Sequence, residues 1–185
     1  MNVYDFDKTI YRGDSTLDFY KCILKKNPKV IKYIFIQIIF AIRYIIKNID
    51  KTRFKEKFYI FLKCIDNVDE EVLVFWEKNE KKIEEWYVEK HRSTDVVISA
   101  SPEFLLKPIC DKLGIKFLMA SIVNKNTGEY TGKNCYGKEK VLRYRKEFDN
   151  EKIDEFYSDS LSDLPLKEIS NKSFLIKNGK ITNWN

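Results

Sequence analysis

The feature that most constrains this chain is a pair of carboxylates at the end of its first apolar segment. Asp5 and Asp7 follow Val3 and Tyr4. Side chains two residues apart in an extended chain point the same way, so both carboxylates face the region beyond this strand. Like charges this close need a cation or a shared proton to offset their repulsion. The pair predicts a metal-assisted reaction centre, although taken alone it also fits a strand that runs into a polar turn.

The remaining sequence alternates in the way that is typical of an α/β fold. Helical patterns come first, at roughly 16–26, 28–48, 51–65 and 69–91. Strand patterns then follow at 95–101, 115–120 and 153–159, with helices at 102–113 and 136–149 and closing strands at 173–177 and 180–184. We therefore expect a three-layer, Rossmann-like, mostly parallel sheet core formed by 1–14 and 93–185. Residues 15–92 are expected to form an inserted all-helical cap.

Composition limits the function classes without selecting one. The net charge of the 185 residues is +6, and the lysines are spread along the chain, so we expect no nucleic-acid partner. A basic surface also suits a phosphorylated substrate or an anionic membrane. The cysteines are too far apart for a zinc motif and indicate a reduced, cytoplasmic protein: Cys22, Cys64, Cys110 and Cys135. Because the chain starts directly in a strand, we also expect no secretory signal.

The segment 30–46 is almost entirely apolar. It is interrupted by Lys32, Gln37 and Arg43, and a spanning helix needs about 20 apolar residues, so we expect no transmembrane segment. Two interpretations remain open. The helix could be buried among its neighbours, or its apolar surface could meet lipid or an acyl-chain substrate as a peripheral contact.

Further polar groups follow the later predicted strands. Ser99 and Ser101 lie where a strand meets a helix, and hydroxyl and backbone donors at such a junction can bind an anion. Asp159 and Asp163 form a second acidic pair after the strand at 153–159. Ligands of open α/β sheets bind beyond the carboxyl ends of the strands, so we expect these groups to meet the first acidic pair.

The order of these groups resembles the haloacid dehalogenase superfamily of phosphohydrolases over nearly the whole chain. Asp5-Phe6-Asp7-Lys8-Thr9-Ile10 matches the first motif of that family, and Ser99 matches the second. Lys140 best fits the third motif, with Lys138 as its rival. The segment 158–163 matches the fourth, with Ser158 where glycine is common. A helical cap between the first two motifs is typical of the phosphoserine phosphatase-like branch of the family, and the chain resembles that branch in this respect.

The resemblance implies a role for each of these residues. Asp5 would be the nucleophile that forms an aspartyl-phosphate, and Asp7 would act as general acid and base. Mg²⁺ is the expected cofactor. Its expected ligand set is Asp5, the Asp7 carbonyl, Asp159 and Asp163. The expected substrate-binding set is Thr9, Asp14, Ser99, Ser101 and Lys140.

The substrate is indicated less clearly. Asp14 stands where phosphoserine phosphatases place an acidic residue for the substrate amine, but Tyr59 stands about where they place a carboxylate-binding arginine. The apolar cap and the segment 163–166 resemble the same parts of certain members of the phosphoserine phosphatase-like branch. Those members are assigned to lipid phosphate substrates such as phosphatidylglycerophosphate. We expect a phosphatase of a hydrophobic or lipid phosphate, with phosphoserine as the alternative. The alternatives of another class are a non-turnover phospho-acceptor and a membrane-surface binding protein.

Overall fold

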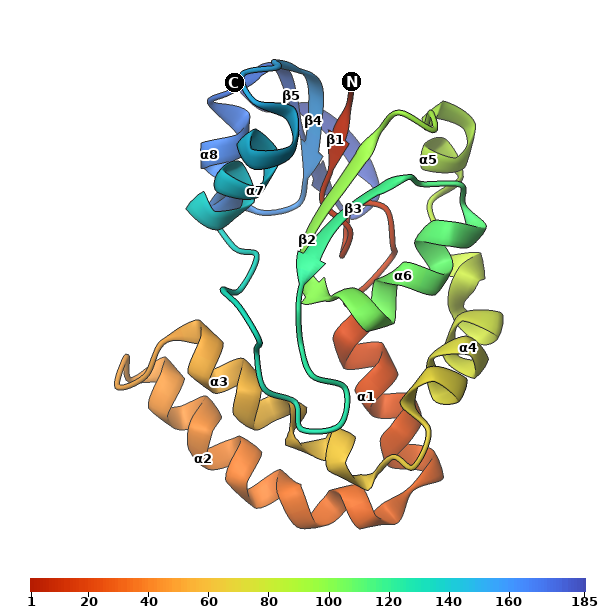
Figure 1. The fold of residues 1–185 in the computed structure, drawn as a ribbon, viewed down its shortest axis with the longest axis vertical. Coiled ribbons are helices and arrows are strands. Elements are labelled where there is room, and N and C mark those ends of the chain that lie inside the picture. The colour runs from red at the N-terminus through yellow and green to blue at the C-terminus, as the bar shows by residue number, and fades with distance from the viewer.

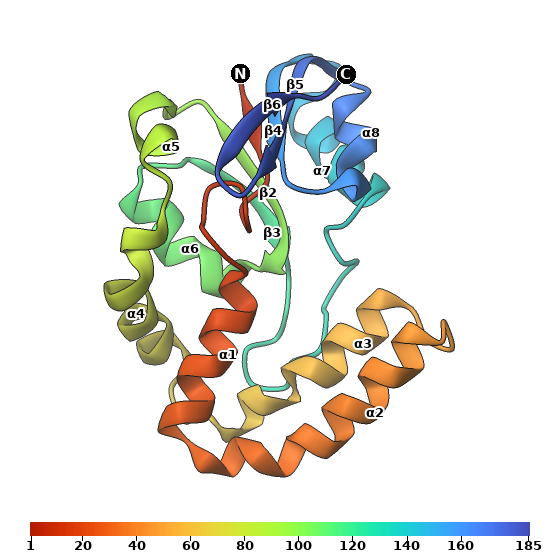
Figure 2. The ribbon, with the colours of Figure 1, turned by 180° about the vertical axis from the view of Figure 1, so that it is seen from behind.

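The fold is built on a six-stranded sheet in the order β3-β2-β1-β4-β5-β6 (Figures 1 and 2). The structure is a computed structural model that describes residues 1–185. All neighbouring strands are parallel except β5 and β6, which form a hairpin around Asn178-Gly179. The strands are β1 (Val3–Tyr4), β2 (Val96–Pro102), β3 (Phe117–Ser121), β4 (Ile153–Ser158), β5 (Ser170–Lys177) and β6 (Lys180–Asn183). The predicted mostly parallel α/β fold is confirmed.

Alternation along the strands divides the core into two halves. Val3, Val96 and Phe156 pack on the face covered by α7 (Lys138–Phe148) and α8 (Leu164–Lys167). Their sequence neighbours Tyr4, Val97 and Tyr157 turn to the other face. The helices on that face are α4 (Val68–Asn79), α5 (Glu85–Lys90) and α6 (Glu103–Lys112). These two covered faces make the three layers.

The remaining helices lie beyond the carboxyl ends of the strands (Figure 1). They are α1 (Ser15–Lys26), α2 (Ile34–Ile45) and α3 (Lys51–Phe58). Short 3₁₀ turns occupy Pro28–Tyr33, Tyr59–Cys64, Glu80–Lys82 and Leu161–Asp163. The loop 122–137 reaches down to α3, where the backbone N–H of Tyr130 donates to Oε1 of Glu56 at 3.4 Å. The α2–α3 hairpin and this loop therefore form a layer apart from the sheet. No helix in the protein is both long and apolar enough to cross a bilayer.

The prediction of one continuous helix at 69–91 is wrong, because the helix is interrupted between α4 and α5. Ile83 forms an antiparallel bridge with Tyr11. Around it, the N–H of Arg12 donates to the carbonyl of Lys82, and the N–H of Glu84 donates to the carbonyl of Ile10, both at 2.8 Å. Backbone groups that a continuous helix would pair internally serve the loop after β1 instead. Tertiary pairing thus overrides the helical pattern here.

The division into a core and a cap at residues 15–92 stays a prediction. Within that range, α4 and α5 pack on the sheet beside α6: the indole N–H of Trp76 donates to the carbonyl of Leu105 at 2.6 Å, and Tyr87 meets Tyr4 edge to face. Only α1 and the α2–α3 hairpin of this range lie beyond the strand ends (Figure 2).

Candidate active site

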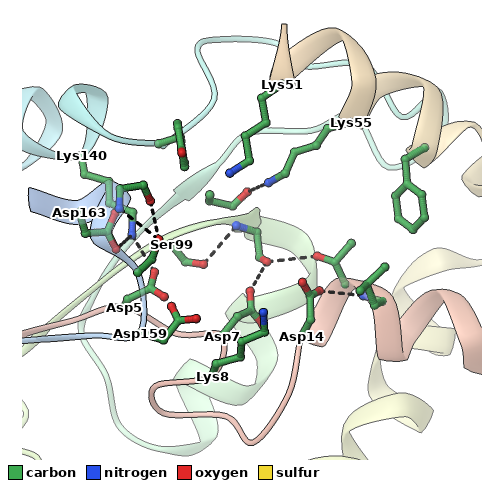
Figure 3. Close-up of a pocket in the computed structure, with 18 of the residues that line it drawn as sticks. Asp5, Asp7, Lys8, Asp14, Lys51, Lys55, Ser99, Lys140, Asp159 and Asp163 are labelled. Atoms are coloured by element: carbon green, nitrogen blue, oxygen red, sulfur yellow. Dashed lines mark hydrogen bonds and ion pairs between the residues drawn. The ribbon is translucent and has the colours of Figure 1, made fainter. Parts of the chain in front are cut away.

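The register of the central strands brings distant parts of the sequence to one edge of the sheet. Tyr4 pairs with Val97 on one side and with Tyr157 on the other. Asp5, Ser99 and Asp159 therefore emerge at the same edge. They open into a cavity of about 430 Å³ between the strand ends and α3 (Figure 3). Its polar lining includes Asp5, Asp7, Lys8, Asp14, Lys51, Lys55, Ser99, Ser101, Lys140, Asp159 and Asp163.

Lys140 is the buried cation of this cavity. Its ammonium donates to Oδ1 of Asp5 at 2.7 Å and to Oδ2 of Asp163 at 2.8 Å. Burial lowers the lysine pKa, but the two carboxylates outweigh it and hold the pKa of Lys140 above its usual range. Gly137, at φ 58°, precedes α7, and Lys140 lies in the first turn of that helix. Lys138 is exposed, so the geometry separates the two lysines that the motif left open.

The carboxylate of Asp7 lies two residues from Asp5 and is held by different partners. It accepts hydrogen bonds from the N–H of Ser15 at 2.6 Å and from the hydroxyl of Ser101 at 2.5 Å. Burial is the main reason that the pKa of Asp7 is raised to about 6, and the nearby charge of Asp14 adds to it. Burial also raises the pKa of Asp5, against the opposing charge of Lys140. The two neighbouring carboxylates thus have different hydrogen-bond partners, while burial raises the pKa of both.

The second acidic pair is fixed by a residue that departs from the family motif. The hydroxyl of Ser158 donates to Oδ2 of Asp163 at 2.8 Å and accepts from the N–H of Ser160 at 3.0 Å. Glycine at position 158 could make neither contact through a side chain. Ser158 therefore fixes Asp163 and the loop that follows β4. Burial is the main cause that raises the pKa of Asp159.

The donors at this edge are chemically suited to a hard divalent cation. No three carboxylate, histidine or cysteine side chains are grouped closely enough to form a ligand set by themselves. Mg²⁺, however, usually takes one or two carboxylates and keeps several waters. Oδ1 of Asp163 is buried without a hydrogen-bond partner, and the Asp5 and Asp159 carboxylates line the same cavity. These all-oxygen donors fit Mg²⁺.

The structure brings all but one of the candidate residues to the cavity. The residues that line it are Asp5, Asp7, Asp14, Ser99, Ser101, Lys140, Asp159 and Asp163. Asp14 also caps α1, because its Oδ1 accepts from the N–H of Leu17 at 2.9 Å. Thr9 is fully buried and does not line the cavity. The chain turns at Lys8, which has φ 58°, and the Thr9 side chain is left in the core.

Two lysines of α3 line the cavity opposite the strand ends, and sequence reasoning missed both. The ammonium of Lys55 donates to the carbonyl of Ala100 at 2.7 Å. That of Lys51 lies 3.5 Å from the ring centroid of Tyr136. Neither forms an ion pair with a carboxylate. Burial is the main cause that lowers the pKa of Lys55 to about 8. The sequence did contain a signal for them: positions 51, 55 and 59 are spaced four residues apart, which places both lysines on the helical face of Tyr59.

Comparison with known proteins identifies the family. The family model described as haloacid dehalogenase-like hydrolase matches residues 3–168. The chain belongs to this family. It is therefore a hydrolase by family membership, and the family predicted from the four motifs is confirmed. No curated protein sequence gives a significant match.

Several solved structures share the fold of this hydrolase. A protein of unknown function from Bordetella pertussis Tohama I has a TM-score of 0.76 and 19% identity, over 94% of this chain and 87% of that one. A phosphoserine phosphohydrolase-like protein from Francisella tularensis subsp. tularensis SCHU S4 has a TM-score of 0.58 and 18% identity, over 94% and 86%. A phosphoserine phosphatase described as a phospho-aspartyl intermediate analogue has a TM-score of 0.52 and 15% identity, over 92% and 83%. At these identities the likeness concerns the fold.

Proposed function

We propose that this protein is a Mg²⁺-dependent phosphomonoester hydrolase that works through an aspartyl-phosphate on Asp5. One observation carries the proposal. The buried ammonium of Lys140 joins Asp5 to Asp163 at the strand ends, with Asp7 in the same cavity. A carboxylate can attack phosphorus only where the charge of the phosphate oxygens is offset, and a fixed ammonium beside it does this.

In the first half-reaction, a carboxylate oxygen of Asp5 attacks phosphorus, and the bond between phosphorus and the ester oxygen breaks. Asp7 gives its proton to the leaving oxygen. The raised pKa of Asp7, about 6, keeps a usable fraction of the acid form near neutral pH. Lys140 and Ser99 would bind the phosphoryl oxygens during the transfer.

In the second half-reaction, the carboxylate of Asp7 takes a proton from water, and the water oxygen attacks phosphorus. The bond between Asp5 and phosphorus breaks, inorganic phosphate leaves, and Asp7 is protonated again for the next cycle. Mg²⁺ would be held by Asp5, the carbonyl of Asp7, Asp159 and Asp163, and would supply compensation for the phosphate charge.

For the substrate, we favour a hydrophobic or lipid phosphate, such as phosphatidylglycerophosphate. The α3 side of the cavity carries Phe54 and Phe58, and Leu17 of α1 also lines it. The same side carries the unpaired ammonium groups of Lys51 and Lys55. An alcohol that is apolar and bears a second anionic group would suit this mixed wall.

Phosphoserine is the alternative substrate, and specific residues support it. Asp14 lies in the cavity and could accept the substrate amine. Tyr59 does not replace the expected arginine, but Lys55, one turn earlier on the same face, offers a cation for the carboxylate. The two substrate classes differ in their direct contact with Asp14: a substrate without an amine forms no ion pair with that carboxylate.

We also propose that residues 15–92 act as the cap that selects the substrate, with the α2–α3 hairpin over the cavity. The cytoplasmic location expected from the cysteines remains a prediction. The rival interpretations of another class are a phospho-acceptor without turnover and a membrane-surface binding protein. Neither would release phosphate repeatedly.

The test is release of inorganic phosphate from a panel of esters, with Mg²⁺ and with chelator. The panel contains phosphatidylglycerophosphate in detergent micelles, phosphoserine, sugar phosphates and an aryl phosphate. We expect many turnovers per protein with Mg²⁺ and none with chelator. Preference for the lipid ester, unchanged in Asp14→Asn, would support the favoured class. Preference for phosphoserine, lost in Asp14→Asn, would establish the alternative. A single equivalent of bound phosphate without turnover would contradict the enzyme proposal.

A further inference from the structure

Exposed apolar side chains follow one another along the outer side of α2 and the turn before it. We call this surface the α2 face. Its exposed members are Ile31, Phe35, Ile38, Ile39, Ile42, Ile45 and Ile46. Phe35 is 76% exposed and Ile45 is 75% exposed. From Phe35 on, these positions follow the three- and four-residue spacing of one helical stripe. Scattered exposed apolar residues need no explanation, but a stripe of this length does.

The orientation of α2 is fixed, so the exposure is built into the fold. Gln37 is buried, accepts a hydrogen bond from the hydroxyl of Tyr20 at 2.7 Å and donates to the carbonyl of Phe58 at 2.8 Å. Tyr44 stacks on Phe54 of α3, with ring centroids 5.1 Å apart. The helix therefore turns Gln37 inward and four of its six isoleucines outward. This is the reverse of the pattern of a surface helix in water.

The charges within the segment that carries the α2 face have one sign. Residues 19–49 contain no aspartate or glutamate. Exposed basic residues flank the apolar stripe at both ends: Lys29 and Lys32 before it, and Arg43 and Lys47 at its far end. None of the four forms an ion pair with a carboxylate; Lys32 lies over the ring of Tyr33, and Arg43 donates to Asn48. An apolar stripe flanked by unpaired cations is complementary to an anionic lipid surface.

We propose that the α2 face binds the surface of an anionic membrane. The helix lies in the plane of the interface, the side chains of Phe35, Ile38, Ile42 and Ile45 enter the acyl region, and the flanking cations meet lipid headgroups. A second copy of the chain suits this face less well, because pairing two such faces would bring like charges together without any carboxylate between them.

Membrane contact of this kind would also set the position of the cavity relative to the membrane surface. The helix α3 packs between α2 and the strand ends (Figure 1), and its other side carries Lys51 and Lys55 of the cavity (Figure 3). A helix with its side chains is about 10–12 Å across. The membrane would thus lie about one helix layer away from α3. The binding itself does not depend on the proposed catalytic function.

The test is sedimentation of the purified protein with vesicles of phosphatidylcholine, with and without about one third phosphatidylglycerol, a headgroup that carries one negative charge. We expect binding to the anionic vesicles, at least tenfold weaker binding to the neutral ones, and weakening at high salt. The variant Phe35→Ser/Ile45→Ser should lower binding to anionic vesicles about tenfold or more. Lys32→Gln/Lys47→Gln should lower it several-fold and reduce its salt dependence.

The matched control is Leu73→Ser/Leu142→Ser, which changes two apolar side chains that are 55% and 58% exposed on α4 and α7. It should bind like the wild type. The proposal is overturned if the wild type stays in the supernatant with anionic vesicles, or if the α2 face variant binds as well as the wild type. It is also overturned if light scattering shows a dimer that only the α2 face variant dissociates, without vesicle binding; the face would then join two copies.

Discussion

The cavity at the strand ends and the α2 face depart from the usual distribution of residues in opposite directions. In the cavity, charged groups are buried: Lys140, Asp5 and Asp163 all lie out of solvent. On the α2 face, apolar groups such as Phe35 and Ile45 lie in solvent. The buried charges offset each other through contacts of 2.7 and 2.8 Å, whereas the exposed apolar side chains have no such compensation within the chain.

This difference separates what the two regions do. Charged side chains that stabilise each other inside the cavity are placed to bind a ligand that enters the cavity, such as a phosphate ester. Apolar side chains that nothing in the chain covers are arranged for a surface outside the protein. Changes in the cavity should therefore alter chemistry and stability together, and changes on the α2 face should alter neither.

The largest expected effect is that of Asp5→Asn. An amide cannot attack phosphorus, so turnover should fall by about 10⁴-fold or more. The fold should survive, because Lys140 keeps Asp163 as its partner. Phosphate release and thermal unfolding measure the two properties, with the exposed Asp111→Asn as the control. Substantial residual turnover in folded Asp5→Asn would remove Asp5 from the role of nucleophile.

The next effect compares Lys140→Ala with Lys138→Ala. Loss of Lys140 leaves two buried carboxylates without their cation, and the free energy of unfolding should fall by about 3 kcal/mol. Turnover should fall by about 10²-fold or more. The exposed Lys138 should change stability by less than about 0.5 kcal/mol. Chemical denaturation and phosphate release provide the comparison. Equal effects of the two substitutions would show that the buried ammonium has no special role.

A smaller effect is expected at Lys55, the cation opposite the strand ends. Its pKa is lowered to about 8, so its ammonium loses its proton as the pH rises from 7 to 9. For a substrate with a second anionic group, kcat/KM should fall over that range. Lys55→Gln should raise KM about tenfold at pH 7. Lys55→Arg should keep its charge and make the fall shallower than in the wild type, leaving the part that comes from deprotonation of Asp7. A pH profile of Lys55→Arg that matches the wild type would assign the fall to another group.

The smallest effect is expected on the α2 face itself. Phe35→Ser/Ile45→Ser should leave the free energy of unfolding within about 0.5 kcal/mol of the wild type, because both side chains are exposed. Turnover of a water-soluble ester should be unchanged. The buried Leu62→Ala should cost about 2–5 kcal/mol by comparison. If the α2 face variant lost as much stability as Leu62→Ala, the stripe would be part of the core.

Features that depend on local sequence could be predicted, and features that depend on distant contacts could not. The acidic pairs follow strands and Ser99 lies within one, and the apolar runs of these strands are visible in the sequence. The topology of a parallel sheet brings the carboxyl ends of such strands together. The break near Ile83 could not be predicted, because it depends on pairing with Tyr11, which is distant in sequence. Tertiary contacts of this kind override helical propensity.

The choice between Lys138 and Lys140, and the role of Lys55, could not be predicted for the same reason: both depend on how a helix packs. Lys138 and Lys140 both lie in the first turn of α7, and which of them points into the cavity depends on how that helix packs on the sheet. The cavity role of Lys55 depends on how α3 lies over β2, where its ammonium reaches Ala100. The exposure of α2 was also open, because an apolar helix buried in the cap and one that faces outward have the same composition. Which of the two occurs depends on the contacts of Gln37, which fix the rotation of α2.

The most direct measurement is to find where phosphate is attached during turnover. The wild type is mixed with the best ester of the panel and Mg²⁺, stopped in acid, and treated with borohydride, which reduces an acyl phosphate. Mass spectrometry of the peptides then locates the reduced residue. We expect reduction at Asp5 alone, dependent on substrate and on Mg²⁺, and absent from Asp5→Asn. Reduction at Asp7 or elsewhere, or steady turnover with no reduced residue, would contradict the role of Asp5 as nucleophile.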